Sequence, residues 1–104
     1  MLTRGDAGAL LIRAIEADAR RRGIAAVVSA ATAKRWASAT FNGMRHELIL
    51  MLSGTPTTEN WLAGLPEAEF NLPGHLVADL AIDATRRDGT ALIATLAALT
   101  VEDA

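Results

Sequence analysis

The residue types best suited to chemistry in this chain stand together at Arg45, His46 and Glu47. A histidine titrates at about pH 6.5 and can act as a general base when a neighbouring group orients it. These three residues lie in a segment with the alternation of a β-strand, where adjacent side chains point to opposite faces. His46 and Glu47 therefore cannot act on one substrate atom. We predict no catalytic residue and expect that the chain is not an enzyme.

The carboxylates of Asp79 and Asp83 are the next candidates, as ligands for a metal ion. Four residues apart on a strand, they lie on one side but about 13 Å from each other, too far to share an ion. The chain has no cysteine, which excludes disulfides and thiolate metal sites. We therefore predict no metal site and no cofactor.

A second hypothesis is that Arg35 and His46 line a pocket for a small anionic ligand between a sheet and its helices. Arg35 stands among apolar residues, and a buried cation requires an anionic partner. Such a pocket would bind a small molecule or support weak catalysis. The alternative is that Arg35 lies at the rim of the sheet and extends its charged end into water.

A β-hairpin predicted around Asn42-Gly43 positions these side chains. Asn-Gly favours a two-residue type I′ turn because both residues tolerate positive φ, so Phe41 should pair with Met44. One face then carries Arg35, His46 and the aliphatic residues, and we expect it to meet the core. The opposite, mixed face carries the remaining residues: Lys34, Trp36, Ser38, Thr40, Arg45, Glu47, Ile49 and Met51.

A second hairpin is predicted around Asp88-Gly89, with Arg87 opposite Thr90. The core candidates are the more apolar face of this hairpin: Leu76, Ala78, Leu80, Ile82, Ala84, Ile93, Thr95, Ala97, Leu99 and Val101. The other face mixes carboxylates with apolar residues: Val77, Asp79, Ala81, Asp83, Thr85, Leu92, Ala94, Leu96 and Ala98. The segment from Ala91 to Val101 could alternatively form an alanine-rich helix.

An amphipathic helix is predicted over residues 7–22, with Thr3 or Asp6 as its N-terminal cap and Gly23 as its end. The stretch from Ile24 to Thr32 could extend this helix. The glycine stop and the β-branched residues that follow favour a strand instead.

A second helix is predicted to begin at Thr55-Pro56, with Trp61 as its anchor in the core. The element order is then α-β-β-α-β-β. It predicts an α+β fold class, a two-layer arrangement in which two helices cover one face of a four-stranded, mainly antiparallel sheet. We expect one domain over residues 1–104.

The face of this sheet that no helix covers is the candidate interface. Its predicted apolar residues are too large and too many to leave in water: Trp36, Ile49, Met51, Leu92 and Leu96. Two copies meeting sheet to sheet would bury them, so the leading hypothesis is an interaction module that forms a homodimer. Alternatively, the C-terminal segment or a loop of the same chain covers this face.

Charge and composition narrow the classes of partner that this chain could have. The net charge is −2 with both signs interspersed, which argues against a nucleic-acid partner. The one basic cluster, Arg20 to Arg22, falls at a helix end, where positive charge is favoured. No apolar run reaches the roughly 20 residues of a membrane span, and the start of the chain does not resemble a signal peptide. We expect a small, soluble, cytoplasmic protein without a membrane partner.

Overall fold

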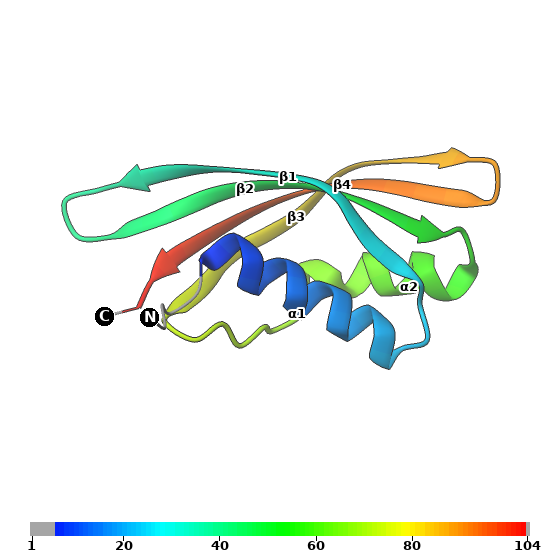
Figure 1. Ribbon diagram of the computed structural model, residues 1–104, viewed down its shortest axis with the longest axis horizontal. Helices are drawn as coiled ribbons and strands as arrows, with labels where there is room; N and C mark the ends of the chain where they lie inside the picture. The colour runs from blue at the N-terminus through cyan, green and yellow to red at the C-terminus, as the bar shows by residue number, and fades with distance from the viewer. Residues whose placement is uncertain (1–5, 104) are drawn as a thin grey trace.

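The computed structural model describes residues 6–103, in which two helices pack on one four-stranded antiparallel sheet. The elements follow in the order α1 (Ala7–Arg21), β1 (Ala26–Ala37), β2 (Asn42–Ser53), α2 (Pro56–Gly64), the 3₁₀ turn η1 (Leu65–Glu67), β3 (His75–Asp88) and β4 (Ala91–Glu102). The strand order is β1-β2-β4-β3, and both helices lie on the same side of the sheet (Figure 1). The predicted α+β fold class is confirmed, and the last segment is a strand rather than a helix.

Both ends of α1 form as the residue types require. The Asp6 carboxylate accepts a hydrogen bond from the Gly8 N–H at 3.1 Å, so Asp6 is the cap. Thr3, the other candidate, lies outside the described residues. Gly23 has φ +72° and donates its N–H to the Arg20 carbonyl, which ends the helix in the left-handed conformation that glycine adopts without steric cost.

The helix α2 is tied to α1 by one buried aromatic side chain. Thr55 caps α2 by accepting the Thr58 N–H at 3.2 Å, and Pro56 takes the first helical position, as predicted. Trp61 is buried in the core, and its indole N–H donates to Asp18 of α1 at 2.8 Å. This hydrogen bond holds the pKa of the Asp18 carboxyl below its ordinary value against the opposing effect of burial.

The first hairpin turns earlier than its sequence indicates. The connection is the loop from Ser38 to Phe41, closed by the pair Ala37 and Asn42, so the predicted two-residue Asn-Gly turn is wrong. The Ser38 hydroxyl accepts the Phe41 N–H at 3.0 Å, and the Ser38 N–H donates to the Phe41 carbonyl at 2.8 Å, so both bonds close the loop. The pairing slides along β2 by an even number of residues, so the side chains that remain in the strands keep the faces predicted for them. Ser38, Thr40 and Phe41 were predicted to lie in the paired strands but lie in the loop.

Gly43 lies within β2 rather than in a turn, and the ring of an aromatic side chain covers it. Its direct partner across the hairpin is Trp36, and a Cβ on Gly43 would lie 2.8 Å from the Trp36 ring atoms Cε2 and Cζ2. That Cβ would also overlap the backbone carbonyl of Thr100. The glycine is therefore required by a close approach inside the sheet, which is a second common use of glycine in strands.

The second hairpin closes through Gly89-Thr90, between Asp88 and Ala91. Gly89 has φ +62°, and none of the described residues other than glycine has a positive φ. Positive φ at the first central position alone is typical of a type II′ turn, so the predicted Asp-Gly type I′ turn is wrong.

The face assignment of β4 is also wrong, and the cause is a bulge in β3. Leu80 and Ile82 point inward as predicted, but the register shift between Ile82 and Ala84 pairs Ile82 with Leu96 rather than with Thr95. The inner face of β4 is therefore the set that the sequence placed outside. A second bulge, between Val77 and Asp79, leaves Leu76 on the outer face with 55 % of its surface exposed.

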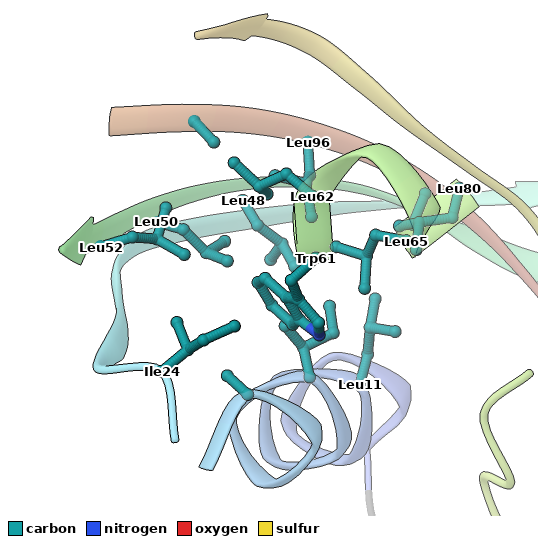
Figure 2. Packing of buried hydrophobic residues seen from close by; sticks show 14 of the residues in the cluster. Leu11, Ile24, Leu48, Leu50, Leu52, Trp61, Leu62, Leu65, Leu80 and Leu96 are labelled. Carbon is teal, nitrogen blue, oxygen red and sulfur yellow. The ribbon is translucent and has the colours of Figure 1, made fainter. Parts of the chain in front are cut away.

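The core lies between the sheet and the two helices (Figure 2). Leu48, Leu50 and Leu52 of β2 are buried, which confirms the predicted inner face of the first hairpin. Around them pack aliphatic residues of both helices, of η1, of the connection before β1 and of the other strands: Leu11, Ile15, Ile24, Leu62, Leu65, Leu80, Leu92 and Leu96. Because both helices pack on the inner side of the sheet, the opposite side has no helical cover.

The close approach at Gly43 gives a stability prediction. Gly43→Ala is expected to lower the free energy of unfolding by about 1–3 kcal/mol, the range for overpacked sites, because neither the Thr100 backbone nor the Trp36 ring can move away freely. Gly64→Ala is the matched control, since a Cβ there meets nothing within 4 Å. Urea unfolding followed by circular dichroism measures both, and equal stability of the two variants would contradict the proposed contact.

Candidate functional site

The candidate site is the outer sheet face, defined as the side of the sheet opposite α1 and α2. The observed pairings align its side chains in rows that cross the four strands in the order β1, β2, β4, β3. The five rows are Trp36–Gly43–Val101–Leu76, Lys34–Arg45–Leu99–Asp79, Thr32–Glu47–Ala97–Ala81, Ala30–Ile49–Thr95–Ala84 and Val27–Met51–Ile93–Arg86. Large apolar residues stand mainly in the first and fifth rows.

Exposed apolar surface is concentrated on this face. Four large hydrophobic residues are exposed among residues 6–103: Val27 at 60 %, Leu76 at 55 %, Phe41 at 53 % and Met51 at 44 %. Three of the four lie on the outer sheet face, and only Phe41 lies elsewhere, in the first hairpin loop. Apolar side chains gathered on one face indicate a contact surface, whereas single exposed ones are ordinary.

A shallow hollow of about 590 Å³ crosses the middle of the face. Short side chains such as Ala97 form its floor, and four charged side chains surround it: Lys34, Arg45, Glu47 and Asp79. Two of these are basic and two are acidic, so the charge around the hollow is balanced. A surface with both signs and apolar ends can meet a copy of itself without net repulsion.

The predicted interface residues divide between the two faces. Trp36, Ile49 and Met51 lie on the outer sheet face. Leu92 and Leu96 are 6 % and 0 % exposed and belong to the core, so they cannot contribute to a contact through the outer face. This part of the predicted interface is wrong because β4 is apolar on both faces, and alternation alone does not show which face is buried.

Several apolar residues of the outer face were not foreseen as interface residues. They come from the strand ends and from β4: Val27, Leu76, Ile93, Leu99 and Val101. The bulge between Val28 and Ala30 turns Val27 outward, and the bulges of β3 do the same for Leu76. No residue type in the sequence marks these bulges.

The residues of the anionic-ligand hypothesis lie on the helix side of the sheet. Arg35 is exposed and lines a hollow of about 220 Å³ together with the carboxylate residues Asp6 and Glu102. His46 is only 3 % exposed, and its Nε2 lies 2.9 Å from the Thr100 hydroxyl oxygen. Arg35 therefore has acidic neighbours rather than an open site for an anion, and His46 is occupied by a hydrogen bond inside the protein.

Burial controls the protonation of His46. The loss of water around the ring lowers the pKa of His46 below its ordinary value of 6.5, and the Asp6 charge opposes this only in part. The first turn of α1 closes over the ring, since a Cβ on Gly8 would lie 3.7 Å from His46 Nδ1. The imidazole is thus a neutral, internal hydrogen-bonding group that joins β2 to β4 beneath the first turn of α1.

Within residues 6–103, no group of three or more histidine, aspartate or glutamate side chains could hold a metal ion. None of the helices described has the length and apolar character that a membrane crossing requires.

Comparisons of this chain with protein-family models, with curated proteins and with solved structures found no match.

The buried imidazole predicts a pH dependence of stability. Because the pKa of His46 is lower in the folded chain, the unfolded chain binds the proton more readily, and stability falls as the pH drops below about 6.5. His46→Gln keeps a polar side chain near Thr100 but does not titrate. Chemical unfolding at about pH 7.5 and about pH 5.5 should show a smaller loss of stability for this variant than for the wild type. An unchanged loss in the variant would show that another group causes it.

Proposed function

We propose that this protein is a non-enzymatic interaction module whose outer sheet face binds a second copy of the chain, giving a homodimer. The observation that carries this proposal is the one-sided cover of the sheet together with three exposed hydrophobic residues, Val27, Met51 and Leu76, on the uncovered side. A dimer would remove this apolar surface from water at about 25 cal/mol per Å².

The extent of the face supports a sheet-to-sheet contact rather than a small-ligand site. Its rows cross all four strands, from Trp36 and Val27 on β1 to Leu76 on β3. Two such faces can pack about 10 Å apart with interdigitating side chains, as in a β-sandwich. The hollow at the centre is shallow and open, so a small molecule there would leave the apolar rows uncovered.

The C-terminal segment is poorly placed to act as the cover. β4 is one of the two central strands and ends at Glu102. The Asp103 N–H donates to the Gly74 carbonyl at 2.9 Å. This bond directs the chain toward the loop before β3. A second molecule is the simpler source of apolar surface for the outer sheet face.

Single acidic substitutions on the outer face test the proposal. Val27→Glu and Leu76→Glu are expected to convert a dimer into a monomer, because each would bring a charge into the apolar contact without removing a core residue. Phe41→Glu is the matched control, since Phe41 is as exposed as Leu76 but lies in a hairpin loop away from the face. Light scattering after size exclusion gives the mass of each variant.

Thermal unfolding of the same samples separates loss of the dimer from loss of the fold. Trp36 is unsuitable for this test, because its ring covers Gly43 and its replacement would disturb the sheet. A wild-type chain that stays monomeric at high micromolar concentration would overturn the proposal. So would a dimer that dissociates with Phe41→Glu but persists with both variants of the outer face.

A further inference from the structure

We propose that the two-fold axis of this dimer runs parallel to the strands, so that β2 of each copy packs on β4 of the other, and β1 packs on β3. This inference rests on the proposed self-association and specifies how the two faces meet. It is drawn from the order of side-chain sizes and charges along the five rows of the outer sheet face.

Two identical sheets that pack face to face have two simple symmetric arrangements, because the two-fold axis must lie in the plane between them. An axis along the strands reverses the strand order and keeps each row on the same row of the partner. An axis across the strands keeps each strand on itself and reverses the order of the rows. The observed order β1-β2-β4-β3 decides which side chains meet in each case.

Side-chain size favours the axis along the strands. The outer residues in the middle of β2 are long, Glu47 and Ile49, whereas those paired with them on β4 are short, Ala97 and Thr95. With the axis along the strands, Glu47 lies over the partner's Ala97 and Ile49 lies over the partner's Thr95. Long side chains then enter the central hollow of the other copy, which gives the close packing found in protein interiors.

The other arrangement would place β2 on β2 and β4 on β4. Long side chains would then oppose long ones on one strand, and short ones would oppose short ones on the next, which leaves a gap. If all five rows overlap, the middle row falls on itself and sets Glu47 against the partner's Glu47. Two like charges at the centre of an interface oppose association.

Charge favours the same axis as size. Lys34 on β1 and Asp79 on β3 are the two ends of one row and lie on opposite edges of the sheet. With the axis along the strands, Lys34 faces the partner's Asp79, and the symmetry repeats this pair at the opposite edge. The dimer thus gains two ion pairs between residues that are too far apart to pair within one chain.

Charge reversal at these two positions tests the arrangement. Lys34→Asp alone and Asp79→Lys alone each create two like-charge contacts in the dimer, and each should raise its dissociation constant by about tenfold or more. The double variant Lys34→Asp with Asp79→Lys should restore the wild-type value. An equimolar mixture of the two single variants should form a heterodimer, because every opposing pair in it is again of opposite charge.

Sedimentation equilibrium at low salt measures all four samples, and Glu69→Lys, an exposed charge in the connection between η1 and β3, controls for net charge. Restoration by the double variant and by the mixture would support the axis along the strands. A wild-type dimer in which the single reversals have no effect, or in which mixing restores nothing, would overturn this axis while leaving self-association intact. A monomeric wild type would overturn the proposed function itself.

Discussion

The structure depends on the pairing of β2 with β4 at the centre of the sheet. This register sets Leu48 beside Leu96 and Leu50 beside Ala94, so that the inner face in the middle of both strands is aliphatic and buried. Side chains alternate, and the same register therefore decides what the outer face carries. Core and candidate interface are two consequences of one set of backbone hydrogen bonds.

The buried side of each helix packs on the inner side of the sheet, where Leu11, Ile15 and Leu62 lie in the core. The bond from Trp61 to Asp18 joins the two helices to each other, and the buried contact of His46 with Thr100 lies beneath the start of α1. The first bond therefore lies within the helical layer, and the second lies within the sheet. The hydrogen bond from Trp61 lowers the pKa of Asp18, and burial lowers the pKa of His46.

The uncovered side has the features of an interface between sheets. Its apolar residues stand toward both ends of the strands, and its charges surround a shallow centre with both signs represented. Such a pattern allows a second copy to bind while charged side chains discourage stacking in other registers. The bulges contribute directly, because they turn Val27 and Leu76 outward and so extend the apolar surface to the edge strands.

The sequence alone determined the order of helices and strands, both ends of α1, the start of α2 and the inner face of the first hairpin. Asp6, Gly23 and the pair Thr55-Pro56 act on their nearest neighbours, so their effect could be predicted without knowing the rest of the fold. Tertiary structure decided the turns, the bulges and the buried side of β4. Asn-Gly suits a tight turn, but here the Thr100 carbonyl and the Trp36 ring leave room within β2 only for a glycine. A strand that is apolar on both faces likewise acquires its orientation from what packs on it, which here is the bulged strand β3 and the two helices.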